Sequence, residues 1–138
     1  MGRPVPNIPH ALLTDRIIGS FYAVYHELGY GFLESVYHVA LCREMHQLGL
    51  HVDSYVPIAV FYKGDMIGRF IADLIIENKI ILELKAGTTI TPAHESQLLN
   101  YLRGTAIEIG FVLNFGPRPQ LKRLIFENRR KVRSPSGG

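Results

Sequence analysis

Three charged residues stand in stretches of the sequence that otherwise read as buried strands. Asp73 interrupts the apolar run Phe-Ile-Ala-Asp-Leu-Ile-Ile, and Glu83 and Lys85 interrupt Ile-Ile-Leu-Glu-Leu-Lys-Ala. Because residues two apart on a strand share a face, Glu83 and Lys85 point the same way, about 6.6 Å apart along the strand. Polar groups at core positions are informative, so these three residues are the first candidates for chemistry.

The length of the turn between the two strands decides whether Asp73 joins this pair. A two-residue turn at 77–78 points Asp73 to the face opposite Glu83. A three-residue turn at 77–79 sets Asp73 opposite Glu83 on the same face, with Cβ atoms about 5 Å apart. Two carboxylates that close repel each other unless one is protonated or a cation lies between them. A hard divalent cation such as Mg²⁺ needs oxygen ligands of this kind.

Two alternatives to a metal site are open at this point. Lys85 could form a buried ion pair with Asp73 or Glu83, which would leave one acid over. One face of the hairpin could also be exposed to water, in which case none of the three charges needs a partner.

Two helices carry further polar side chains beside their apolar stripes. In the first half of the chain, Glu34 lies at the edge of the buried side of its helix. In the second half, His94, Gln97 and Tyr101 fall within about 60° of one another. Gln and Tyr are suited to bonding phosphate oxygens, although an ordinary half-buried helix boundary explains them as well. His94 fits the start of a helix better than it fits a metal ligand.

The hydrophobic pattern predicts one α/β domain, with a mixed sheet and helices. Helices are expected over about residues 10–28, 32–48 and 91–102, and strands over 52–62, 66–76, 79–86, 107–115 and 121–126. The first strand is expected to place Tyr55, Pro57, Ala59 and Phe61 on one face. Residues 1–9 are expected to be a disordered lead-in, residues 10–127 the domain, and residues 128–138 a basic, flexible tail.

Charge is unevenly spread along the 138 residues. The chain carries a formal net charge of +3, but the segment from Gly116 onward has seven basic residues and one acid, so the rest of the chain is acidic. A basic end beside an acidic body could meet phosphates or could simply be solvated. The candidate contacts to nucleic acid here are Lys122, Arg123, Arg129 and Arg130.

Composition excludes several classes of protein. The single cysteine, Cys42, rules out an intramolecular disulfide and a multi-cysteine zinc site. No apolar run is long enough to span a membrane, and no glycine-rich loop has the spacing that cradles phosphates. The first residues lack the apolar core of a signal peptide, so we expect a cytoplasmic protein with no membrane partner.

The ordered set of motifs resembles the PD-(D/E)XK nuclease superfamily. Asp73 matches the motif aspartate, with Ala72 in place of the proline that often precedes it, and residues 83–85 match the E-x-K motif. Residues 97–101 match the Q-x-x-x-Y motif of one branch of that superfamily. Residues 31–37, Gly-Phe-Leu-Glu-Ser-Val-Tyr, match the signature of the GxxExxY family.

The resemblance implies a restriction-endonuclease-like core, with a mixed central sheet flanked by helices, and a metal-dependent nuclease that hydrolyses phosphodiester bonds of nucleic acid, with DNA expected. On this resemblance Asp73, Glu83 and the backbone carbonyl of Leu84 would hold Mg²⁺ or Mn²⁺. Lys85 would orient the attacking water or neutralise developing charge, and Glu34 would complete the metal shell.

The resemblance also assigns Gln97 and Tyr101 to positioning the nucleic-acid backbone. A second hypothesis is a non-catalytic nucleic-acid or protein-interaction module that keeps the nuclease fold. A homodimer or an unidentified protein partner is compatible with so small a domain.

Overall fold

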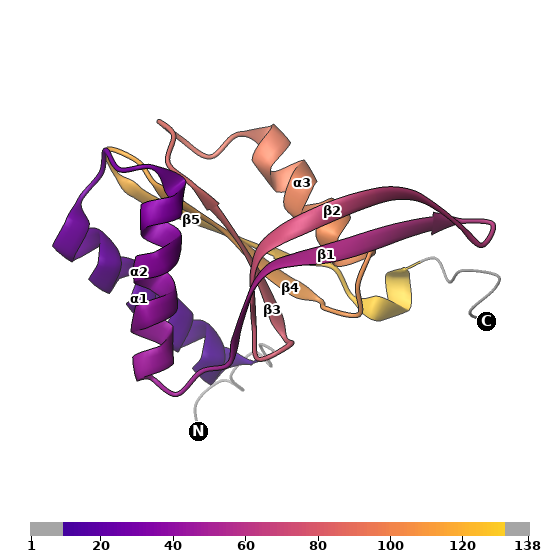
Figure 1. Ribbon diagram of the computed structural model, residues 1–138, viewed down its shortest axis with the longest axis horizontal. Coiled ribbons are helices and arrows are strands. Elements are labelled where there is room, and N and C mark those ends of the chain that lie inside the picture. The colour runs from indigo at the N-terminus through magenta and orange to yellow at the C-terminus, as the bar shows by residue number, and fades with distance from the viewer. Residues whose placement is uncertain (1–9, 132–138) are drawn as a thin grey trace, which may run out of the picture.

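The computed structural model describes residues 10–131, and within them five strands form one mixed sheet with helices on both faces (Figure 1). The strand order is β1-β2-β3-β4-β5; only β3 and β4 are parallel, and α3 joins them. The predicted order of elements and the α/β architecture are confirmed. The elements are α1 (Ala11–Leu28), α2 (Glu34–Gln47), β1 (Val52–Tyr62), β2 (Asp65–Ile76), β3 (Ile80–Lys85), α3 (Pro92–Arg103), β4 (Ile109–Phe115), β5 (Pro119–Ile125) and a short 3-10 helix, η1 (Asn128–Arg130).

The two faces of the sheet have separate apolar cores. Helices α1 and α2 pack on one face, where Ile80, Leu82 and Leu84 of β3 point. Helix α3 packs on the other face, which receives Ile81. Side chains alternate along a strand, so Glu83 and Lys85, two and four residues after Ile81, belong to the α3 side of the sheet.

The turn between β2 and β3 has the longer of the two predicted lengths. Ile76 pairs with Ile80, which leaves residues 77–79 as the turn. Glu77 and Asn78 both have φ near +54°, and the Lys79 N–H donates to the carbonyl of Ile76 at 2.9 Å. Continued one step beyond its last pair, Leu74–Leu82, this register sets Asp73 opposite Glu83.

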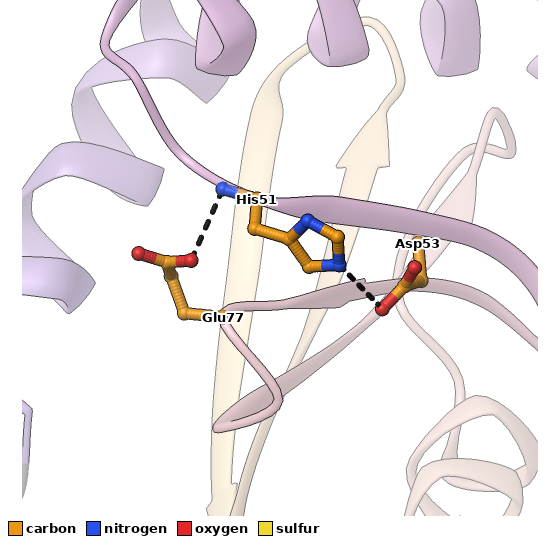
Figure 2. A network of polar contacts seen from close by, with 3 residues as sticks. All are labelled: His51, Asp53 and Glu77. Carbon is orange, nitrogen blue, oxygen red and sulfur yellow. Dashed lines mark hydrogen bonds and ion pairs between the residues drawn. The ribbon is translucent and has the colours of Figure 1, made fainter.

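Polar contacts attach the start of β1 to this turn, as Figure 2 shows. The backbone N–H of His51 donates to the Glu77 carboxylate at 3.1 Å, and the His51 ring lies 3.1 Å from the carboxylate of Asp53. In return the Glu77 N–H donates to the His51 carbonyl. These bonds fix the register of β1 against β2.

The sheet forks next to Asp73. The β2–β3 ladder stops at the pair Leu74–Leu82, whereas β1 and β2 stay paired as far as Tyr62–Asp65. Beyond the fork, β1 and β2 form a two-stranded arm that projects from the domain (Figure 1). The fork opens the space in which the candidate site lies.

Strand β1 is less regular than predicted. Tyr55 has φ +53° and is skipped by the ladder, and a second irregularity falls between Val60 and Phe61. These two breaks interrupt, at Tyr55 and at Phe61, the alternation that was expected to put Tyr55, Pro57, Ala59 and Phe61 on one face. They are irregularities of the kind that bend a strand and redirect a side chain, and local periodicity does not encode them.

The basic segment begins against the domain. Asn128–Arg130 forms η1, the Asn128 N–H donates to the Glu108 carboxylate, and the Lys131 ammonium donates to the carbonyls of Thr105 and Ile107, both at 2.8 Å. Residues 128–131 therefore differ from the flexible tail that was expected. The predicted lead-in at 1–9 and the remainder of the tail lie outside the described residues. Across residues 10–131, none of the helices combines the length and the apolar character that a membrane crossing requires.

Candidate active site

Asp73 and Glu83 face each other at the fork between β2 and β3. The backbone N–H of Asp73 donates to Oε1 of Glu83 at 3.1 Å, and the backbone N–H of Leu84 donates to Oδ2 of Asp73 at 2.8 Å. Where the ladder stops, these side-chain bonds take the place of backbone pairing. Each carboxylate is therefore fixed through one oxygen, and its second oxygen is the candidate ligand atom.

Burial makes this pair of acids unusual. Glu83 is 2% exposed, and its removal from water raises its pKa to about 8, with the nearby Asp73 carboxylate acting in the same direction. The pair is therefore poorly suited to carry two negative charges without a cation. The two carboxylates are oxygen donors of the type that Mg²⁺ and Mn²⁺ prefer, and Leu84, whose N–H donates to Asp73, adjoins them.

A cavity of about 230 Å³ adjoins the Asp73 carboxylate. Glu34, the first residue of α2, lines one wall of it. Within residues 10–131, no three acidic, His or Cys side chains converge closely enough to form a metal cage by themselves. Glu34 therefore shares the cavity without joining the two carboxylates. The lining residues are Glu34, Ser35, His38, Tyr55, Asp73 and Leu84.

Lys85 is held by α3 and not by the acids. Its ammonium donates to Oε1 of Gln97 at 3.0 Å, and Nε2 of Gln97 donates to the hydroxyl of Tyr101 at 3.0 Å. The ion pairs found among the described residues do not include Lys85, so the buried ion pair considered above is not formed. Tyr101 is only 3% exposed, and burial raises its pKa. Gln97 and Tyr101 thus position the lysine, and any contact of theirs with nucleic acid stays a prediction.

His94 starts α3. The Thr91 side chain accepts from the His94 N–H, and Nδ1 of His94 accepts from the Thr91 N–H, which together form a capping box. This agrees with the sequence-based preference for a helix-start role. Burial, with Lys85 contributing, lowers the pKa of His94.

The loop between α1 and α2 brings Glu34 to the cavity. Gly31 has φ +110°, a region that favours glycine, and Tyr37 donates its hydroxyl proton to the Gly29 carbonyl at 2.7 Å. The Tyr37 ring stacks on Phe115 of β4, with centroids 4.2 Å apart. The glycine, the glutamate and the tyrosine of the 31–37 motif therefore act together to fix where α2 begins.

Asn114 fixes the loop that follows Lys85, a role that sequence reasoning missed. The buried Asn114 amide accepts from the Gly87 N–H and donates to the Gly87 carbonyl, both at 3.0 Å. A Cβ on Gly116 would lie 2.3 Å from that carbonyl, so the approach requires glycine. The available signal was a polar residue inside the fully buried strand β4.

His38 and Tyr55 were also missed as cavity residues. His38 follows Glu34 by one helical turn, a spacing that could have identified it. It is buried, its Nε2 lies 3.0 Å from the Ser54 hydroxyl, and burial lowers its pKa while Asp73 opposes that shift. Tyr55 reaches the cavity through its left-handed backbone, for which the sequence carries no signal.

The predicted basic contacts do not form one patch. Lys122 lies 3.8 Å from Glu95 in the first turn of α3, whereas Arg130 stacks on Phe126 near the other end of that helix, beside Arg103. Arg123 follows Lys122 on β5 and therefore points to the opposite face of the sheet. Arg129 forms an ion pair with Glu127.

Comparison with known proteins gives one family and one fold. Among solved structures, the crystal structure of SSO0001 is similar with a TM-score of 0.50 and 19% sequence identity, and the match covers 67% of this chain and 50% of that chain. The chain thus spans half the length of that structure, and at this identity the likeness concerns the fold alone. No curated protein matches the chain significantly.

The family comparison covers most of the domain. A model described as the PD-(D/E)XK nuclease superfamily matches residues 11–124, from the first turn of α1 to near the end of β5. That span includes both carboxylates at the fork, Lys85 and the residues that hold it. The chain therefore belongs to the PD-(D/E)XK nuclease superfamily.

Proposed function

We propose that this protein is a divalent-metal-dependent nuclease that hydrolyses phosphodiester bonds, with DNA as its substrate. The observation that carries the proposal is the convergence of Asp73 and Glu83 at the fork, with Lys85 two residues after Glu83 on β3 and held there by Gln97. On residues 31–37 we assign the chain to the GxxExxY group within its superfamily.

Each residue of the site has a role that follows from its surroundings. Asp73, Glu83 and the Leu84 carbonyl would hold Mg²⁺ or Mn²⁺, which when bound supplies an activated water and stabilises charge on the phosphate. Lys85, fixed by Gln97 two residues after Glu83 on β3, would help to balance the charge that develops on a phosphate.

Cation binding also accounts for the buried acid. Two neighbouring carboxylates, one of them withdrawn from water, gain most when a divalent cation offsets their charge. Glu34 lies across the cavity, where it can accept a hydrogen bond from a water molecule or a substrate group. A binding module without catalysis has no use for this combination of buried acids and a positioned lysine.

Cleavage of labelled oligonucleotides tests the proposal. Single- and double-stranded DNA are incubated with Mg²⁺ or Mn²⁺ and the wild type, Asp73→Asn, Lys85→Ala or the control Asp53→Asn, an acid on β1 that contacts His51 outside the cavity. We expect cleavage by the wild type and the control and a loss of about 100-fold or more in the two site variants. Cleavage that survives both site substitutions would refute the proposal. Nucleic-acid binding without any cleavage would favour the interaction module.

A further inference from the structure

Tyr55 lies across the hairpin from Asp73 at a position where the strands do not pair. The β1–β2 ladder joins residue 54 to residue 74 and residue 56 to residue 72, so Tyr55 occupies the skipped position opposite Asp73. Its φ of +53° is rare for a bulky aromatic residue. The irregularity therefore falls at the point on β1 that adjoins the candidate metal ligands.

A second ring holds the side chain of Tyr55 in place. The His38 imidazole stacks on it with ring centroids 4.3 Å apart and an interplanar angle of 5°. His38 itself is buried on α2 and contacts the Ser54 hydroxyl, so the stack connects α2 to the arm. Tyr55 is nevertheless 55% exposed. Since His38 covers one face of the ring, this exposure belongs to the other face and the edges.

Packing does not account for this arrangement. A ring that is more than half exposed buries little apolar area, and a left-handed tyrosine is a cost that the surrounding structure must maintain. Strained residues and strand irregularities gather at ligand sites, where they direct a side chain toward a bound group. Tyr55 also lines the same cavity as Asp73 and Glu34.

We propose that Tyr55, backed by His38, is a stacking platform for an unpaired base of the nucleic-acid strand whose phosphate lies at Asp73 and Glu83. This inference rests on the proposed nuclease function. An aromatic ring accepts any base through its π-face, whereas a base inside a duplex already has both faces covered by its neighbours. The platform therefore selects single strands, or strand ends with an unstacked base, over intact duplex.

Equilibrium binding distinguishes a contact with the base from contacts with the sugar–phosphate backbone. Fluorescence anisotropy in millimolar Ca²⁺ compares labelled oligo-dT with an abasic oligonucleotide of equal length and charge, and gel electrophoresis checks that both stay intact. The proteins are the wild type, Tyr55→Phe, which keeps the ring, and Tyr55→Asn, which removes it with a residue that tolerates positive φ. Tyr62→Ala is the control, because Tyr62 is a similarly exposed tyrosine, 59%, on the same arm. Thermal unfolding shows that each variant is folded.

The wild type and Tyr55→Phe are expected to bind oligo-dT about 5- to 100-fold more tightly than the abasic strand, and Tyr55→Asn is expected to lose that preference. The control keeps it. Equal binding of the two strands by the wild type, or an unchanged preference in Tyr55→Asn, overturns the platform and leaves the nuclease proposal standing. A wild type that binds neither strand contradicts both proposals.

Discussion

The raised pKa of Glu83 makes the metal-free protein less stable as the pH increases. The pKa of this carboxyl rises from 4.5 to about 8 on folding, chiefly because it is buried. Between these two values the folded protein holds a proton that the unfolded chain has released, so the free energy of unfolding falls with increasing pH. A rise of this size lowers the free energy of unfolding by an amount that approaches about 5 kcal/mol above pH 8. That amount is comparable with the whole stability of a small domain.

Glu83→Gln removes this dependence. The amide is close in shape to the protonated acid and can still accept the Asp73 N–H through its oxygen. We therefore expect the variant to match the wild type near pH 5 and to exceed it by several kcal/mol near pH 8.5 in the presence of a chelator. Urea unfolding followed by circular dichroism across pH 4.5–9 measures the difference.

A matched substitution separates burial from charge. Glu27→Gln changes the same group at an exposed position on α1 and should leave the pH profile of the wild type in place. Mn²⁺ should stabilise the wild type at high pH, where Glu83 is ionised, and should have much less effect on Glu83→Gln. If Glu83→Gln and the wild type have parallel stability curves in chelator, Glu83 is not a buried acid with a raised pKa, and the argument for a cation at this position fails.

Two further predictions concern the surroundings of the site. Asn114→Ala leaves the N–H and carbonyl of Gly87 without their partner, so the free energy of unfolding measured by chemical denaturation should fall by about 1–3 kcal/mol. Asn128→Ala, which truncates an exposed side chain, should lower it less. Equal losses in the two variants would show that the loop does not depend on Asn114. Replacing Arg129 and Arg130 together by Ala should weaken DNA binding and reduce the slope of log K against log salt by about 0.7–0.9 for each lost phosphate contact. An unchanged slope would limit these two arginines to their contacts with Glu127 and Phe126.

The hydrophobic periodicity was sufficient to predict the order of elements and to separate the strands from the helices. It also predicted that Glu83 and Lys85 share a face, because that relation is local to one strand. The position of Asp73 was not predictable, because it depends on one residue in the turn. Glu77 and Asn78 adopt two successive positive φ angles, which composition does not specify for a glutamate.

Long-range contacts explain the rest of what sequence reasoning missed. Lys85 pairs with Gln97 and not with an acid, since the packing of α3 on the sheet brings the amide to the ammonium. The Tyr55–His38 stack likewise depends on where α2 meets the arm. Neither contact has a periodic signal, because each joins residues from elements that approach only in the folded protein.

Location of Mn²⁺ by anomalous scattering tests the central claim most directly. Crystals of the wild type and of Asp73→Asn, soaked in saturating Mn²⁺, are compared in anomalous difference maps. The proposed site predicts a strong peak bounded by the carboxylates of Asp73 and Glu83 and the carbonyl of Leu84, at about 2.0–2.4 Å from the ligand oxygens, and its loss in the variant. A wild-type map without a peak there, or a peak that Asp73→Asn leaves unchanged, would contradict a metal-dependent nuclease built on these residues.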